Sequence, residues 1–166
     1  MYVVCADSEA IHTYKADTLS PSGKDIHVKG MSNPTDIVAC RRDRQLYVAD
    51  WSRPSCIWQV SADDRRVVKW PTTDNFEIWS LSMKSRRLLV TSPPRSLLRY
   101  NTKDKKALPV IELPMFVKTL LHSIETTRGT FVVCHQGTSQ DEEQFAVSER
   151  FGFCYALVIL IAVNYL

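Results

Sequence analysis

The residues best suited to binding chemistry are two clusters of cations in predicted loops. Arg41, Arg42 and Arg44 make the first cluster, and Lys84, Arg86 and Arg87 make the second. Arginine and lysine side chains bind phosphate groups and acidic peptide segments through charge-assisted hydrogen bonds. Charged loops also have a structural use, because they discourage strand edges from aggregating. Asp43, Asp74 and Glu77 lie nearby in sequence and dilute the positive charge, so both interpretations stay open.

Residue types used in catalysis and metal binding are present, but their spacing matches no catalytic or metal-binding motif. The four histidines are His12, His27, His122 and His135, and the five cysteines include no C-x-x-C pair. His135 directly follows Cys134, but neighbouring residues of a strand point to opposite faces and cannot easily bond each other. We therefore expect no catalytic residue, no metal site and no cofactor, with the histidines structural or exposed.

Asp50 and the four tryptophans have structural interpretations. Asp50 follows the apolar run Tyr47-Val48-Ala49, where its carboxylate is expected to cap a turn by accepting backbone N–H groups. The tryptophans are Trp51, Trp58, Trp70 and Trp79, all within 29 residues. Aromatic residues at strand positions commonly fill the space between packed sheets, and we expect that role here.

Composition limits the classes of protein to which the chain can belong. It has 166 residues, of which 45% are apolar and 23% charged, as in an ordinary globular domain. Lysine and arginine number 21 against 18 acidic residues, and this net charge of +3 is too small to indicate nucleic-acid binding by itself. Only five glycines are present, which argues against glycine-rich phosphate loops.

A repeat of about 43 residues provides the elements that position these side chains. Four apolar quartets begin 45, 42 and 43 residues apart: 1–4, 46–49, 88–91 and 131–134. Each is short and apolar, as expected of a buried strand. Further short apolar runs before and after each quartet, separated by polar turns, complete units of four strands. We expect strands near 46–50, 56–60, 66–70, 78–83, 88–92, 97–100, 108–112, 118–124 and 131–135.

The period and the strand count are those of a β-propeller blade. The sequence therefore predicts an all-β fold: an incomplete β-propeller of four-stranded antiparallel blades in residues 1–150. The blade units are about 1–30, 33–73, 76–114 and 117–149. The first unit lacks its opening strand and the fourth its closing strand, which leaves about three and a half blades, whereas closed propellers have four to eight. We expect a fragment of a larger propeller, or one closed by another chain. The core residues are expected to be Leu46, Val48, Ile57, Leu88, Val90 and Val133.

Residues 33–70 resemble an NHL repeat. They have Pro34 before the first strand, the second strand Leu46-Tyr47-Val48-Ala49-Asp50 and an apolar third strand at 56–60. The match is fair in 76–113 and weak in 1–30 and 117–149. The glycine usual in the first turn is replaced by Arg41-Arg42-Asp43-Arg44, and the usual Asn-x-Arg before the third strand is missing. The Gly-His and Trp-Asp pairs of WD40 repeats are also missing.

The C-terminal segment 151–166 is apolar at 14 of 16 positions. A membrane-spanning helix needs roughly 20 such residues, so the segment is short for that role. It could be a buried strand or helix, a short tail anchor, or a stretch foreign to the fold. We favour the last interpretation and expect these residues to pair with no sheet.

The predicted function is that of a non-catalytic scaffold whose loops bind another protein. Repeat equivalence places both basic clusters on one rim of the propeller, where RNA is an alternative partner. A membrane is a partner only through residues 151–166; we otherwise expect a cytoplasmic location. The rival hypothesis from a different class is a propeller enzyme of the lactonase or amidating-lyase type, which would hold a metal ion in its central channel.

Overall fold

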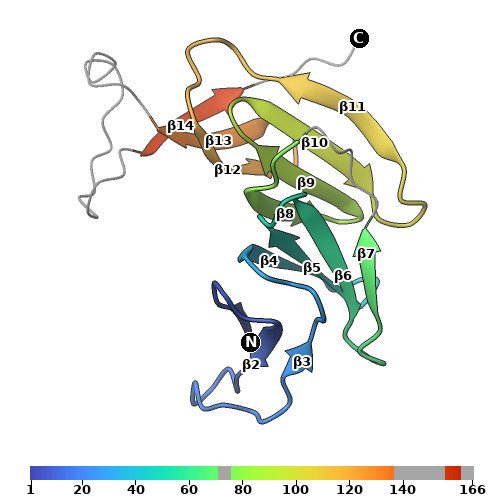
Figure 1. The fold of residues 1–166 in the computed structure, drawn as a ribbon. Coiled ribbons are helices and arrows are strands. Elements are labelled where there is room, and N and C mark those ends of the chain that lie inside the picture. Colours follow the sequence, from blue (N-terminus) through green and yellow to red (C-terminus); the bar gives the residue numbers. More distant parts are fainter. Residues whose placement is uncertain (71–75, 137–155, 162–166) are drawn as a thin grey trace. The chain divides into compact units, whose positions relative to one another are not determined.

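The structure is a computed structural model that describes residues 1–70, 76–136 and 156–161. Its strands form four antiparallel sheets, and within each sheet the strands lie side by side in chain order (Figure 1). The first sheet contains β1 (Tyr2–Val4), β2 (Ala10–Thr13) and β3 (Ile26–His27). The second contains β4 (Pro34–Cys40), β5 (Gln45–Asp50), β6 (Cys56–Ser61) and β7 (Val67–Trp70).

The third sheet contains β8 (Ser80–Lys84), β9 (Arg87–Ser92), β10 (Ser96–Asn101) and β11 (Ala107–Glu112). The fourth contains β12 (Leu120–Glu125), β13 (Phe131–Gln136) and β14 (Ala156–Ile161). All nine strands expected between residues 46 and 135 are present, and their ends differ from the expected ones by at most two residues. The chain divides into two compact units, Met1–Leu81 and Ser82–Leu166.

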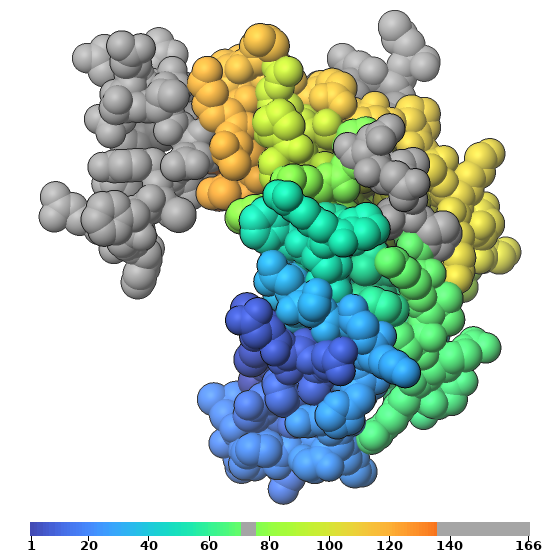
Figure 2. Space-filling model, viewed as in Figure 1, coloured from blue at the N-terminus to red at the C-terminus, as the bar shows by residue number. Residues whose placement is uncertain are grey.

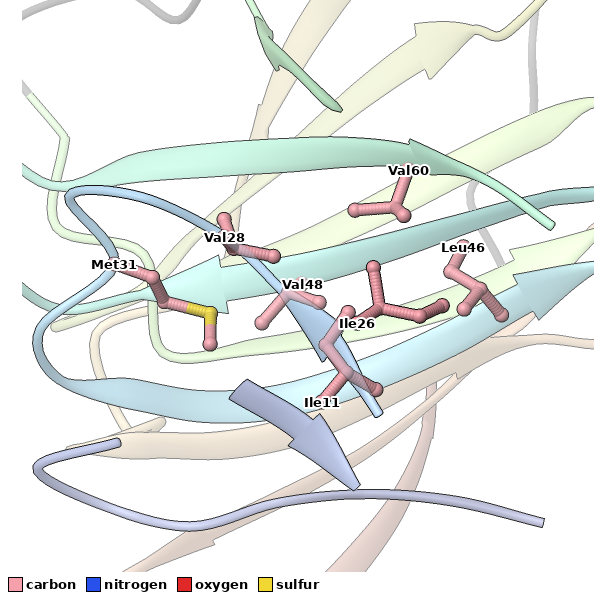
Figure 3. Close-up of a cluster of buried hydrophobic side chains, with 7 residues drawn as sticks. All are labelled: Ile11, Ile26, Val28, Met31, Leu46, Val48 and Val60. Atoms are coloured by element: carbon pink, nitrogen blue, oxygen red, sulfur yellow. The ribbon is translucent and has the colours of Figure 1, made fainter. Parts of the chain in front are cut away.

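The core of the first unit lies between its two sheets. It is formed by Ile11, Ile26, Val28, Met31, Leu46, Val48 and Val60 (Figure 3). Leu46 and Val48 lie on the same face of β5 because side chains alternate along a strand. Figure 2 shows the dark blue N-terminal residues packed against the lighter blue residues of β4. Each fully buried aliphatic side chain stabilises the fold by about 1.5–3 kcal/mol.

The core of the second unit is a separate cluster. It contains Leu89, Leu97, Leu113, Val117, Leu120, Phe131 and Val133. A hydrogen bond of 2.6 Å between the hydroxyls of Thr91 on β9 and Ser123 on β12 lies buried beside it. All six predicted core residues are at most 2% exposed, which confirms the assignment of inward-facing positions.

The expectation that residues 151–166 pair with no sheet is wrong. β14 forms an antiparallel ladder with β13 that runs without a break from Phe131↔Ile161 to Gln136↔Ala156. The run contains Val158, Ile159 and Ile161, whose β-branched side chains favour strands over helices, and the ladder pairs its backbone groups. The strand that we expected at 145–147 lies outside the described residues. Over the described ranges, no helix is long and apolar enough to cross a membrane.

Candidate functional site

The first basic cluster lies in the exposed turn between β4 and β5. Arg44 forms a salt bridge with Asp63 in the turn between β6 and β7, and its carbonyl accepts the N–H of Ala62 at 2.9 Å. The Arg44 side chain is 71% exposed, so solvent screens this ion pair and it contributes little to stability. Arg41 and Arg42 are exposed in the same turn. This cluster thus consists of solvated side chains, one of which is paired.

The second basic cluster lies at a depression in the surface of the second unit. Lys84 ends β8, Arg86 lies in the following turn and Arg87 begins β9. Together with residues of the β10–β11 hairpin, they line an open hollow of about 420 Å³, which we call the basic depression. Its lining residues are Lys84, Ser85, Arg86, Arg87, Asn101, Lys103 and Leu108. The structure therefore brings the predicted residues Lys84, Arg86 and Arg87 together and adds Lys103, which sequence reasoning missed.

Backbone hydrogen bonds fix the two turns that form the basic depression. The carbonyl of Arg86 accepts two hydrogen bonds from Thr102, from its N–H at 2.8 Å and its hydroxyl at 3.1 Å. The side-chain oxygen of Asn101 accepts the N–H of Lys103 at 2.9 Å. The second interaction is a local turn of the kind that asparagine favours. The cationic side chains therefore project from turns held in one arrangement.

A buried carboxylate holds two of the residues that line the depression. Glu125, at the end of β12, has a side chain that is only 2% exposed. One of its oxygens accepts hydrogen bonds from Lys84 Nζ at 2.9 Å and from Arg87 at 2.5 Å. Burial by itself raises the pKa of Glu125, but the hydrogen bonds from Lys84 and Arg87 outweigh burial and lower it below its ordinary value. Lys84 also donates to the carbonyl of Thr126 at 2.5 Å, so its position is fixed from two sides.

Both clusters occupy the turn between the first and second strands of a four-stranded sheet, as repeat equivalence predicted. One cluster lies in each of the two units. That both clusters share one rim of the propeller therefore stays a prediction.

Asp50 has the structural role that the sequence predicts. Its carboxylate is fully buried and accepts the backbone N–H groups of Ser32, Asn33 and Ser52 at 2.9–3.2 Å. It also accepts the indole N–H of Trp58 at 2.9 Å, a contact that sequence reasoning missed. Asp50 therefore ties the entry to β4 to the end of β5 and to β6.

His12 lies between the side chains of Asp25 and Ser8, and this arrangement has a structural explanation. Its Nδ1 lies 2.9 Å from Asp25, and its Nε2 lies 3.5 Å from the hydroxyl of Ser8. The hydroxyl of Ser8 accepts the N–H of Ala10 at 3.1 Å, which commits it to the local turn. The N–H of Thr13, followed by the His12 side chain, lowers the pKa of Asp25. These contacts hold β2 against the segment that leads into β3.

The tryptophans do not all share the role expected of them. Trp70 is buried and packs edge-on against Tyr47, with ring centroids 5.2 Å apart. Trp58 packs against the core of the first unit. Trp51 is 36% exposed and contacts Trp79 with centroids 5.5 Å apart, so the expectation that it fills space between sheets is wrong. It follows the end of β5 and therefore lies in a loop.

Among the residues that the structure describes, no group of three or more His, Cys, Asp or Glu side chains is placed to hold a metal ion.

Comparison with known proteins shows the fold. No family model matches the chain, and no curated protein matches it. Among solved structures, a chain of a nidogen/laminin complex matches with a TM-score of 0.61 and 11% identity over 78% of this chain and 51% of that one. The WD40 domain of Neurospora crassa Pan2 matches with a TM-score of 0.62 and 11% identity over 96% of this chain and 45% of that one.

The structure of U3-55K matches with a TM-score of 0.64 and 14% identity over 81% of this chain and 42% of that one. The chain thus covers about half, or less, of each chain that it matches. The matched regions are β-propeller domains. At these identities the likeness establishes architecture alone. The repeated antiparallel sheets of this chain therefore have the β-propeller fold, as the 43-residue period predicted.

Proposed function

We propose that the chain is a non-catalytic binding module that recognises an acidic segment of a partner protein through the basic depression. The observation that carries the proposal is the convergence of four cationic residues on one hollow: Lys84, Arg86, Arg87 and Lys103. They come from two turns that hydrogen bonds hold together. Loops on rigid sheets are common places for recognition sites, because the scaffold fixes their geometry.

The composition of the lining favours a protein segment over RNA. Proteins that bind single-stranded RNA usually stack its bases on aromatic side chains along an extended basic track. Within the described part of the chain, the lining of the basic depression contains no aromatic side chain, and Leu108 is its one apolar member. Cations around a compact hollow suit a carboxylate-rich peptide, whose charges can pair with them at short range.

We further propose that the repeats are of the NHL type. Support comes from the Leu46–Asp50 strand, whose final carboxylate accepts backbone N–H groups on the segment that precedes Pro34. The residues of the motif are the residues that make this contact, so the sequence pattern has a structural reason. The proposal predicts that Asp50 is required for stability.

Fluorescence anisotropy with the full chain tests the binding proposal. The probes are three labelled decamers: a Glu/Asp-rich peptide, a Lys/Arg-rich peptide and a single-stranded RNA. We expect the acidic peptide to bind most tightly and to weaken as salt rises from about 50 to about 300 mM, because ions screen exposed charges. The double substitution Arg86→Glu and Lys103→Glu should abolish binding.

Lys118→Glu provides a matched control for charge, since this exposed lysine precedes the other end of β12 and does not line the depression. It should leave the affinity unchanged. Tighter binding of the RNA, absence of acidic-peptide binding, or an equal effect of Lys118→Glu would contradict the proposal.

A further inference from the structure

We infer that the basic depression recognises a phosphorylated serine or threonine on the partner protein. The inference rests on the proposed function and names the chemical group that the depression selects. A phosphate ester carries a charge of about −1.5 to −2 at neutral pH and presents three acceptor oxygens. A carboxylate carries one charge on two oxygens, so a site with several converging donors discriminates between them.

Two of the cations that line the depression are already ordered before a ligand binds. Lys84 and Arg87 share one oxygen of the buried Glu125, and Lys84 also donates to the carbonyl of Thr126. Immobilising a long side chain on binding costs conformational entropy, and this ordering reduces that cost. Glu125 therefore presents two cations at a fixed separation before any ligand arrives.

Donors on Arg87 and Asn101 remain available for an anion. Arg87 is 41% exposed, and its guanidinium carries five N–H donors, of which the contact with Glu125 uses the NH1 group. The Asn101 oxygen is occupied by the N–H of Lys103, which leaves the two amide N–H donors as the ligand-binding end of this side chain. Arg87 and Asn101 line the same hollow as Lys103.

Positive charge exceeds negative charge at the hollow. Of the described residues, Lys84, Arg87 and Lys103 line it, and the carboxylate of Glu125 pairs with the first two of them. A ligand that carries nearly two negative charges on one phosphorus centre matches this excess better than a single carboxylate. The hollow, of about 420 Å³, is also large enough to admit the residues that flank the phosphate, with Leu108 as an apolar contact for one of them.

Isothermal titration calorimetry on the full chain tests the inference. The probes are three decapeptides of one sequence whose central residue is phosphoserine, serine or aspartate, together with inorganic phosphate. We expect the phosphopeptide to bind at least about tenfold more tightly than the aspartate peptide, because it forms additional charge-assisted hydrogen bonds. Its affinity should fall from about pH 7.5 to about pH 5.5, because the second pKa of the phosphate is about 6.

Substitutions locate the binding to the depression. Arg86→Ala and Lys103→Ala should each weaken phosphopeptide binding by about fivefold or more, while Lys118→Ala should leave it unchanged. Circular dichroism of each variant establishes that it is folded. Lys84 and Arg87 are left intact in this experiment because they also stabilise the buried Glu125.

The outcomes separate this inference from the function on which it rests. If an acidic Glu/Asp-rich peptide binds but the phosphoserine and aspartate peptides bind equally, the inference is wrong and the proposed function stands. If no peptide binds, both are wrong. Binding of inorganic phosphate as tight as that of the phosphopeptide would overturn the peptide specificity. If the chain bound phosphoinositide-containing vesicles or RNA more tightly than the phosphopeptide, the inference would be overturned as well.

Discussion

Asp50 combines complete burial with four hydrogen bonds, and its removal should be costly. Asp50→Ala would leave the N–H groups of Ser32, Asn33 and Ser52 and the indole of Trp58 without their acceptor. A buried donor without a partner costs about 1–3 kcal/mol, so we expect a loss of at least about 3 kcal/mol in the free energy of unfolding. Urea unfolding followed by tryptophan fluorescence measures this loss.

Asp63→Ala is the control for Asp50→Ala, because the exposed pair between Asp63 and Arg44 should contribute less than about 1 kcal/mol. An Asp50→Ala protein that unfolds within about 0.5 kcal/mol of the unsubstituted chain would show that the contacts of Asp50 do not stabilise the fold.

Glu125 gives the second unit a pH dependence whose sign follows from its lowered pKa. A carboxyl with a lower pKa in the folded state stabilises that state above its unfolded pKa, ordinarily 4.5. The contribution is lost as the pH falls through the lower folded value. We therefore expect Glu125→Gln to be less stable than the unsubstituted chain at neutral pH, with the difference shrinking below about pH 4.5. Urea unfolding followed by circular dichroism at several pH values measures it, and a pH-independent difference would contradict the argument.

Residue roles were predictable from sequence where the partners are local or follow from the strand pattern. Asp50 was assigned correctly because a carboxylate just after a buried strand commonly meets the N–H groups of a turn. Glu125 was missed because its partners Lys84 and Arg87 lie 41 and 38 residues away in sequence. Lys103 was missed for a similar reason, since the bonds between Thr102 and Arg86 that bring its turn to the depression have no sequence signature.

The strand β5 is buried on both of its faces, since every residue from Leu46 to Asp50 is buried. Val48 is fully buried in the core of the first unit (Figure 3). Val48→Asp would place a carboxylate there without a partner, and we expect a loss of several kcal/mol, enough to unfold a domain of ordinary stability. Val68→Asp is the matched control on β7 of the same sheet, because Val68 is 38% exposed. Thermal melting compares them, and equal melting temperatures would show that the facing of β5 is misassigned.

The pairing of β14 with β13 predicts that the C-terminal segment stabilises the second unit. A chain ending at residue 155 would lose all six register pairs of this ladder, whereas a chain ending at residue 161 would keep them. We expect the shorter chain to melt several degrees lower, because about 1 kcal/mol shifts the melting temperature of a small domain by 4–8 °C. Differential scanning calorimetry compares the two truncated chains, and identical melting would exclude a stabilising role for β14.

At the scale of elements, the sequence predicted strands well and misjudged the C-terminal segment. Alternating or short apolar runs between polar turns recurred four times, and the repetition removed the ambiguity of each single run. The 156–161 run lacks alternation, because its residues are apolar at every position, so periodicity could not distinguish strand from helix. Its β-branched residues were the better indicator of a strand.

For the whole molecule, the period of the repeat predicted the β-propeller architecture. Sequence identities of 11–14% with solved propellers reflect a fold that depends on apolar pattern and turn chemistry rather than on particular residues. The net charge of +3 is equally uninformative about a partner. The cations of the proposed binding site come together instead because the β8–β9 and β10–β11 turns lie side by side in the folded chain.

The non-catalytic proposal and the rival enzyme hypothesis differ in the response of the whole chain to metal ions. A propeller enzyme of the lactonase type would hold a metal ion in the native state, and a ligand bound only to that state stabilises it by about 2.7 kcal/mol at a hundredfold excess over its Kd. A binding module that acts through lysine and arginine side chains gains nothing from a cation. We therefore expect the melting temperature and acidic-peptide affinity of the full chain to be the same with Ca²⁺, Mg²⁺, Zn²⁺ or a chelator. A rise of several degrees with one of these ions, reversed by the chelator, would favour the enzyme and refute the proposed function.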